Sequence, residues 1–134
     1  MGKHIIICSA NSALLDAASR TFGLQGPRFS VCESGLEVLG AVGVVEADLL
    51  ILDMQTPGLN GLLIISAVRE LAPKLPILAV SAYPQEDART FAHKGVSYIT
   101  LPSGSNGGAR AFSAVLAQVG QMQEMGFPTG AGTR

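Results

Sequence analysis

Residues 48–61 have the sequence DLLILDMQTPGLNG. The aliphatic residues at 49–52 form a short, continuous apolar run, which is typical of a β-strand buried on both faces. Asp53 follows this run directly, and the Pro-Gly pair at 57–58 indicates a turn. Ligands collect at the carboxyl ends of strands in open parallel sheets, so Asp53 and the residues after it form the first candidate site.

Further runs of the same kind predict the rest of the sheet. They are residues 5–8, 29–32, 77–80 and 96–99, and they are rich in β-branched or aromatic residues. Apolar residues at helical spacing lie between the runs and after the last one, over residues 14–22, 36–42, 64–71, 88–92 and 112–122. Five strands alternating with five helices predict an α/β fold with right-handed crossovers and one parallel sheet covered on both faces.

Residues at the ends of the predicted helices support these boundaries. Ser34 and Glu37 form a capping box for the second helix. Acidic residues at 86–87 and basic residues at 93–94 give the charge order that the dipole of the fourth helix favours, and Gly95 follows.

The composition limits the classes to which the protein can belong. The chain has 134 residues, of which 48% are hydrophobic, which suits one domain with a sizeable core. Only 14% of the residues are charged, against about 25% in a typical protein. This predicts a face that meets another protein, for which a homodimer is one form. A net charge of −1 without a basic run argues against phosphate-driven binding to nucleic acid.

Hydropathy predicts a chain without membrane contact. The longest apolar stretch, residues 36–52, is interrupted by three acidic residues, and a membrane span needs about 20 apolar residues. The first hydrophobic run is too short for a signal peptide, so we expect a cytoplasmic protein. We expect residues 1–125 to form the domain, and residues 126–134, with three glycines and one proline, to form a flexible tail or the start of a linker.

The cysteines and histidines do not have the spacing of a metal site. Cys8 and Cys32 lie in apolar segments without CxxC or Cys/His spacing, which favours buried reduced thiols. His4 and His93 have no partners at ligand spacing, and His93 is better explained by the end of the fourth helix.

Three segments, in order, resemble the receiver domains of two-component response regulators, and the resemblance covers essentially residues 3–124. Residues 48–61 resemble the third strand of that family and the turn after it. Residues 77–82 resemble the fourth strand, which ends in Ser or Thr followed by Ala. Residues 95–102 resemble the fifth strand and the proline of the family's Lys-Pro pair. The resemblance implies a flavodoxin-like three-layer fold with strand order 2-1-3-4-5.

The resemblance also implies roles for individual residues. Asp53 matches the aspartate that takes a phosphoryl group from a phosphohistidine of a partner kinase, Ser81 matches the hydroxyl residue after the fourth strand, and Tyr98 matches the switch aromatic residue. In the family, Mg²⁺ and a lysine neutralise the charge of the moving phosphoryl group. An acidic pair after the first strand, the acceptor aspartate and a main-chain carbonyl two residues later hold the metal.

The sequence departs from the family at the positions that carry charge. Ser9 and Ala10 stand where the acidic pair belongs, and Leu101 stands where the lysine belongs. Asp53 and the carbonyl of Gln55 alone would bind Mg²⁺ poorly, because this ion is usually held through one or two carboxylates and substrate phosphate. We therefore expect weak or absent Mg²⁺ binding, no other cofactor, and little or no Mg²⁺-dependent phosphorylation.

These observations predict a degenerate receiver that is not an enzyme and that works through protein contact. The expected surface is the face from the fourth to the fifth helix, and the expected partner is a histidine kinase or an output domain, with a homodimer also open. Three alternatives remain: slow phosphorylation at Asp53, anion or flavin-phosphate binding by the loop at residues 9–13, and a hydrolase using Ser9 or Ser81.

Asp53 and Tyr98 also have interpretations in which they serve the structure and not a function. Asp53 could simply accept hydrogen bonds from the turn at 54–58 or from the hydroxyls of Ser9 and Ser81. Tyr98 could pack on a half-buried edge with its hydroxyl in water.

Overall fold

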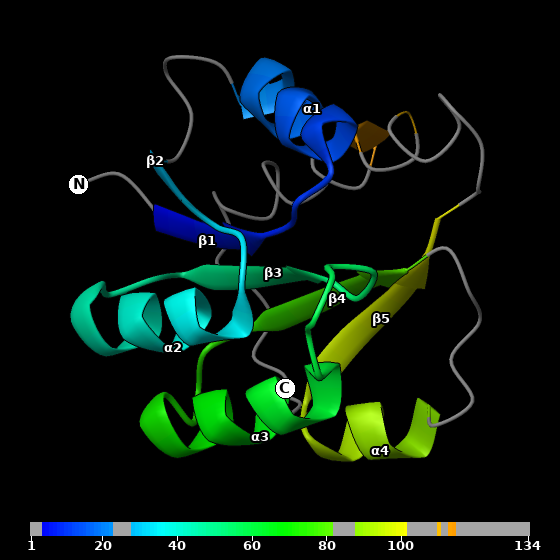
Figure 1. Ribbon diagram of the computed structural model, residues 1–134. Coiled ribbons are helices and arrows are strands. Elements are labelled where there is room, and N and C mark those ends of the chain that lie inside the picture. The colour runs from blue at the N-terminus through cyan, green and yellow to red at the C-terminus, as the bar shows by residue number, and fades with distance from the viewer. Residues whose placement is uncertain (1–3, 23–27, 82–87, 102–109, 111–112, 115–134) are drawn as a thin grey trace.

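Five parallel strands form the centre of the molecule, in the order β2-β1-β3-β4-β5 (Figure 1). The computed structural model describes residues 4–22, 28–81, 88–101, 110 and 113–114. The strands are β1 (His4–Cys8), β2 (Arg28–Cys32), β3 (Leu49–Asp53), β4 (Ile77–Ser81) and β5 (Val96–Thr100). The predicted sheet, its parallel pairing and its strand order are therefore confirmed.

The described part of the chain has four helices, not the five that the periodicity predicted. They are α1 (Ser12–Phe22), α2 (Gly35–Val44), α3 (Gly61–Leu71) and α4 (Ala88–His93). The fifth predicted helix, at 112–122, falls almost entirely outside the described residues, as do the acidic residues at 86–87.

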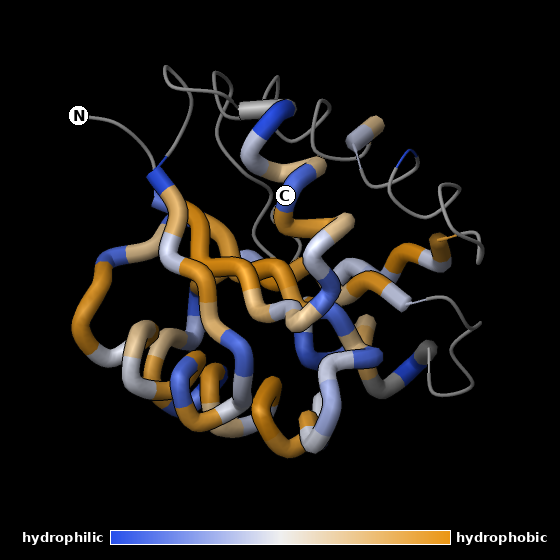
Figure 2. The backbone as a smooth tube through the Cα atoms, turned by 45° about the horizontal axis from the view of Figure 1, so that its top comes forward, coloured by the Kyte–Doolittle hydropathy of each residue, from blue (hydrophilic) through white to orange (hydrophobic). Residues whose placement is uncertain are grey.

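Two hydrophobic layers lie on opposite faces of the sheet, and Figure 2 shows hydrophobic residues along the strands in the middle of the molecule. One layer joins the sheet to α1 through Ile5, Ile7, Leu14, Ile51 and Val80, among others. The other joins it to α2, α3 and α4 through Ile6, Val38, Ile65, Val68 and Phe91, among others. Alternate residues of one strand enter opposite layers, which is why the buried strands are apolar throughout.

The ends of the helices follow local chemistry. Ser34 Oγ accepts from the Glu37 amide at 3.2 Å, and Glu37 Oε1 accepts from the Glu33 amide at 2.8 Å, so α2 has the predicted capping pair, with the carboxylate bonded one residue further upstream. Gly95 follows α4 with a φ of 72°, a left-handed value that suits glycine at a helix end.

The strand register brings the carboxyl ends of the strands to one edge. Cys8 pairs with Cys32 on β2 and with Leu52 on β3, Asp53 pairs with Val80, and Ser81 pairs with Thr100. The residues that follow these strand ends are therefore neighbours, although they are far apart in the sequence.

Cys8 and Cys32 are buried free thiols, as predicted. Among the described residues, no helix combines the length and the apolar character that crossing a bilayer requires.

Candidate functional site

The candidate site lies at the carboxyl edge of β1, β3 and β4. Asp53 is the last residue of β3, Ser9 follows β1, and Ser81 ends β4. All three are almost completely buried, with exposed fractions of 5%, 1% and 3%. A buried carboxylate needs hydrogen-bond donors around it, so its partners decide what the site can do.

Two neutral donors hold the carboxylate of Asp53. The hydroxyl of Ser9 donates to Oδ2 at 2.7 Å, and the amide of Gln55 donates to Oδ1 at 3.0 Å. Thr56 adds to the turn, because its hydroxyl donates to the main-chain carbonyl of Asp53 at 2.7 Å. The structural reading of Asp53, as an acceptor for Ser9 and for the turn after it, matches these contacts.

The side chain of Gln55 joins the ends of β3 and β4. Its Nε2 donates to Ser81 Oγ at 2.8 Å, while its main-chain amide binds Asp53. The sequence had indicated Gln55 only for its carbonyl oxygen, and the side-chain bond had no signal in the sequence. One residue of the turn thus contacts both Asp53 and Ser81.

The loop before α1 is also tied to this network. Ser9 Oγ accepts from the amide of Asn11 at 3.0 Å, and Asn11 Oδ1 accepts from the amide of Ala13 at 2.9 Å. The amides of Asn11 and Ala13 at this helix start are therefore already bonded within the chain. Among the contacts of the described residues, none favours the flavin-phosphate alternative or the hydrolase.

Leu101 occupies the position at which the resemblance implies a lysine. Its amide donates to the carbonyl of Ser81 at 2.6 Å, so the backbone after β5 lies at the site. Its side chain is 5% exposed and packs in the hydrophobic layer beneath α1. An aliphatic side chain buried there brings no positive charge to Asp53.

The described residues at this edge offer a poor set of ligands for a magnesium ion. Ser9 supplies a hydroxyl that is already bonded to Asp53, and the exposed side chain of Ala10 is a methyl group without a ligand atom. In the part of the chain that the structure describes, Asp53 is the one carboxylate at this edge, whereas this hard ion is held through oxygen ligands that offset its charge. Among the described residues, no three His, Cys, Asp or Glu side chains gather in one place.

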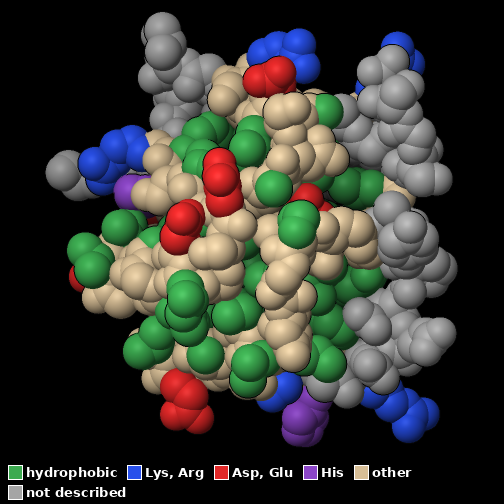
Figure 3. Space-filling view, viewed as in Figure 1, with side chains coloured by type: hydrophobic (Ala, Val, Ile, Leu, Met, Phe, Trp, Pro, Cys, Tyr) green, Lys and Arg blue, Asp and Glu red, His purple; other side chains and the backbone are tan. Residues whose placement is uncertain are grey.

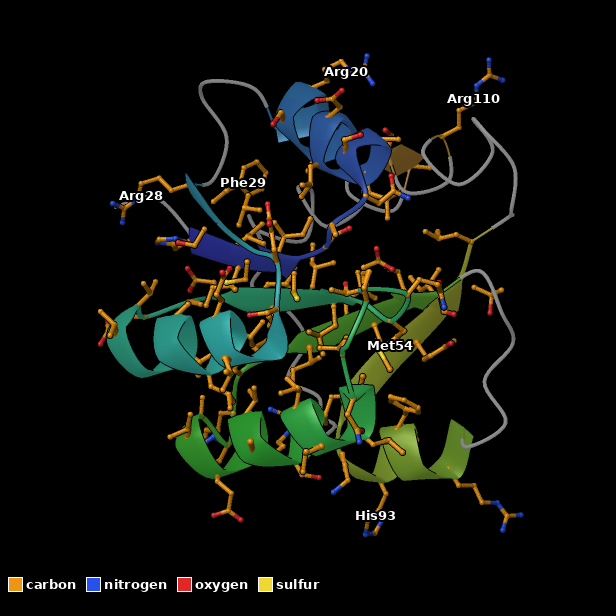
Figure 4. The ribbon with its side chains drawn as sticks, in the orientation of Figure 1. Arg20, Arg28, Phe29, Met54, His93 and Arg110 are labelled. Atoms are coloured by element: carbon orange, nitrogen blue, oxygen red, sulfur yellow. The ribbon has the colours of Figure 1, made fainter. Side chains whose placement is uncertain are left out.

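Met54 turns away from the polar network. Its Sδ lies 3.0 Å from the point that a Cβ at Gly61 would occupy, so the thioether packs over the first turn of α3 (Figure 4). Glycine at position 61 leaves the space that this side chain fills. The turn after Asp53 therefore has one polar side, made by Gln55 and Thr56, and one apolar side, made by Met54.

Tyr98 lies on β5 with its ring against α4. Its ring centroid is 5.2 Å from that of Phe91, with the planes tilted by 57°. Phe91 is buried and Tyr98 is half-buried, which agrees with the packed ring of the structural interpretation; the position of its hydroxyl in water stays a prediction. A ring held by such a pair gains packing energy in this orientation.

Arg69 makes a set of structural hydrogen bonds that the sequence did not reveal. From α3 its guanidinium donates to the carbonyls of Lys94, Leu75 and Gly95 at 2.7, 2.6 and 3.2 Å. Burial lowers the pKa of Arg69 from its ordinary value. This cation lies at the end of the sheet opposite to Asp53 and fastens the ends of α3 and α4. Figure 4 shows three further arginines, Arg20, Arg28 and Arg110, pointing outward at the periphery.

Comparison with known proteins places these observations in a family context. The family model of the response regulator receiver domain matches residues 5–101. The DNA-binding transcriptional regulator NtrC of Klebsiella pneumoniae is 33% identical over 89 residues, which are 66% of this chain and 18% of NtrC. The chain thus spans less than a fifth of the length of this relative.

Solved structures have the same fold. A CheY-like response regulator receiver domain protein from Methanospirillum hungatei JF-1 matches with a TM-score of 0.73 and 19% identity, over 93% of this chain and 98% of that one. The response regulator domain of Thermotoga maritima CheB matches with a TM-score of 0.75 and 15% identity, over 96% of this chain and 100% of that one.

Proposed function

This chain belongs to the response regulator receiver domain family of two-component signalling, and from that membership we propose that it is a pseudo-receiver. It signals through protein contact, without Mg²⁺-dependent phosphorylation of Asp53. It is not an enzyme, and it needs no metal or other cofactor. The fold is retained as a scaffold, while the chemistry of phosphoryl transfer is lost.

The observation that supports this proposal is the set of residues around Asp53. A hydroxyl, a methyl group and an aliphatic side chain, from Ser9, Ala10 and Leu101, stand at the positions that carry charge in the family. Phosphoryl transfer depends on positioning and on neutralising the charge of the equatorial oxygens. The described partners of Asp53 are both neutral, so they offer hydrogen bonds but no positive charge.

The three replacements are consistent with one another. A second carboxylate at position 9 or 10 would repel Asp53 in the absence of a metal, and a lone cation at position 101 would pair with it. Because the extra carboxylates and the cation are all absent at these positions, Asp53 acts as a hydrogen-bond acceptor that stabilises the fold. Through Ser9 and Gln55 it holds together the loops after β1 and β3, and the Gln55 side chain extends the network to β4.

The contact surface in this proposal is the face of α4 and β5, which carries Tyr98. On this face the ring of Tyr98 packs on Phe91, and in this proposal the face binds its partner without a phosphoryl group. The partner is a histidine kinase or an output domain, in the cytoplasm. A second copy of the chain at this face is the other outcome that a binding experiment would show.

Acetyl phosphate tests the proposal directly. The purified chain is incubated with this donor and Mg²⁺, and its intact mass is measured alongside Asp53→Asn and an Mg²⁺-dependent receiver domain. We expect no gain of a phosphoryl group by this chain under conditions that fully label the other receiver. A stoichiometric gain that Asp53→Asn abolishes would overturn the proposal and establish slow phosphorylation, the alternative that Asp53 and Ser81 keep open.

A further inference from the structure

Helix α2 is apolar over most of its surface. Its sequence is GLEVLGAVGV, in which Glu37 is the single charged residue. Only Val38 in this helix is fully buried, against the sheet. A surface helix normally presents charged or polar residues on the side away from the core. The outward side of α2 therefore exposes apolar groups to solvent without an evident structural reason.

The outward side of α2 combines two bulky residues with bare backbone. Leu36 is 82% exposed and Val44 is 86% exposed. Between them lie Gly40 and Gly43, both exposed, with no other atom within 4 Å of the place where a Cβ would stand. Helical periodicity places these four positions on the same side, because they are 3, 4, 7 or 8 residues apart or adjacent. Another chain could approach the helix backbone closely between the two side chains.

The apolar surface continues onto α3, which packs beside α2 (Figure 1). Leu63 and Leu71 on α3 are 63% and 55% exposed. We name this set the α2–α3 surface; it consists of Leu36, Gly40, Gly43, Val44, Leu63 and Leu71. Figure 3 shows hydrophobic side chains across this part of the molecule. An exposed apolar area that spans two elements marks an interaction site more often than scattered single residues do.

The charged residues around this surface are mostly of one sign. Among the described residues from 33 to 75, the exposed acidic side chains are Glu33, Glu37, Glu46 and Glu70, and Lys74 is the one exposed basic side chain. The guanidinium of Arg69 binds main-chain carbonyls instead of facing solvent. Figure 3 shows acidic side chains at the margins of the apolar area. A partner that is apolar at its centre and basic at its edges would complement this surface.

We propose that the α2–α3 surface binds an amphipathic helix of a partner protein, with an apolar stripe flanked by Lys and Arg. A helix fits because it can lie along the exposed sides of α2 and α3, and the glycines of α2 let it come close. A symmetric dimer fits less well, because it would set the same acidic margin against itself. The inference does not depend on whether Asp53 accepts a phosphoryl group or on the face of α4 and β5.

A designed peptide tests the chemistry of this surface. The probe is an 18-residue helix with leucines on one face and lysines on both flanks, and its counterpart has glutamates in place of the lysines. Binding to the full chain is measured by fluorescence anisotropy at low and at physiological salt. We expect the lysine peptide to bind at least tenfold more tightly than the glutamate peptide, with a difference that shrinks as salt rises.

Matched variants locate the binding. The double variant Leu36→Ser, Val44→Ser removes the two most exposed aliphatic side chains, and we expect it to weaken binding of the lysine peptide at least tenfold. Val31→Ser is the control, since Val31 is 51% exposed but belongs to β2 and points to the other face of the sheet. The double variant Glu46→Lys, Glu70→Lys should reverse the peptide preference, whereas Asp16→Lys on α1 should not.

Several outcomes would overturn the proposal. They are equal binding of the two peptides, absence of binding, or a loss with Val31→Ser as large as the loss with the α2 variant. Light scattering adds one more: a dimer of the unmodified chain that Leu36→Ser, Val44→Ser converts to a monomer would assign this surface to a second copy. Circular dichroism of each variant confirms that the fold is retained.

Discussion

The hydroxyl of Ser9 binds a buried carboxylate without adding charge. In a receiver that holds Mg²⁺, a second carboxylate near this point is useful because the metal compensates both. Without the metal, two carboxylates at hydrogen-bond range repel each other, and the repulsion is strong because the site is buried. We therefore expect a carboxylate at position 9 to destabilise the chain, and a bound metal to reverse this effect.

The substitution Ser9→Asp tests this dependence. In EDTA we expect the variant to lose on the order of 2–4 kcal/mol of unfolding free energy, because Asp53 gains a like charge as its neighbour. Millimolar Mg²⁺ should recover much of this loss, because a second carboxylate starts to rebuild a metal site. The measurement is urea unfolding followed by circular dichroism, with and without Mg²⁺.

Ser9→Asn is the control, because it has the size of aspartate without its charge. Its stability should be the same in EDTA and in Mg²⁺. Equal stability of the two variants in EDTA would show that position 9 does not sense the charge of Asp53, against the 2.7 Å contact between Ser9 and that carboxylate.

The sequence predicted much of the site, because the ends of buried strands determine which residues meet. Ser9, Asp53, Ser81 and Leu101 were all placed at one edge from the strand pattern, and the structure brings them there. The bond from the Gln55 side chain to Ser81 was missed, since it depends on a rotamer that leaves no pattern in the sequence. Arg69 was missed because its partners are main-chain carbonyls of residues up to 26 positions away.

At the level of elements, α2 contains glycines in two different environments. A Cβ at Gly35 would lie 2.6 Å from Cδ1 and 2.9 Å from Cγ1 of the buried Ile64 on α3. A Cβ at Gly40 would meet no atom within 4 Å. The first glycine permits close packing of α2 on α3, while the second makes no contact within the described chain and leaves the helix less stable than alanine would.

Alanine at these two positions should therefore change stability in opposite directions. We expect Gly35→Ala to lower the free energy of unfolding by about 1–3 kcal/mol, because Ile64 must shift within a packed core. We expect Gly40→Ala to raise it by about 0.5–1 kcal/mol, through better helix propensity. Thermal and urea unfolding of both variants measure the difference. A stabilising Gly35→Ala would contradict the close packing of α2 on α3.

Element boundaries show where sequence patterns are sufficient. Each strand was predicted to within one residue at either end, because its apolar run coincides with its buried length. The helix predicted from residue 64 begins instead at Gly61. Asn60 explains the difference, since its side chain accepts from the amide of Leu63 and starts the helix before the apolar spacing becomes regular. The turn before the helix provides the capping residue, so the apolar spacing within the helix does not indicate where the helix begins.

For the molecule as a whole, the low content of charged residues and the exposed apolar side chains are both found on α2. Only 14% of the residues are charged, which predicted a face for another protein without indicating where it lies. The structure shows that α2 contributes strongly to this shortage, with one charged residue in its ten. Uncharged residues thus lie around Asp53, at Ser9, Ala10 and Leu101, and small or aliphatic residues form the exposed surface of α2 and α3.

The two buried thiols couple global stability to pH. Burial raises the pKa of the Cys8 thiol from 9.0 to about 11, and the neighbouring Cys32 adds to the rise. Burial likewise raises the pKa of Cys32. The folded chain therefore keeps protons that the unfolded chain releases near pH 9. A raised pKa of this kind stabilises the fold fully below pH 9, and the contribution is lost as pH rises toward 11.

We therefore expect the free energy of unfolding to fall between pH 9 and pH 11, by about 1 kcal/mol per pH unit from Cys8 alone. Urea unfolding at pH 7, 9 and 10, with a reducing agent present, measures the slope.

Lysine and tyrosine also titrate in this range, so the reference is the double variant Cys8→Ala, Cys32→Ala, which keeps those groups. Its curve should be lower at pH 7, because the thiols no longer fill the core, but flatter above pH 9. Parallel curves would contradict the raised pKa values and show that the thiols ionise as readily in the folded chain as in the unfolded one.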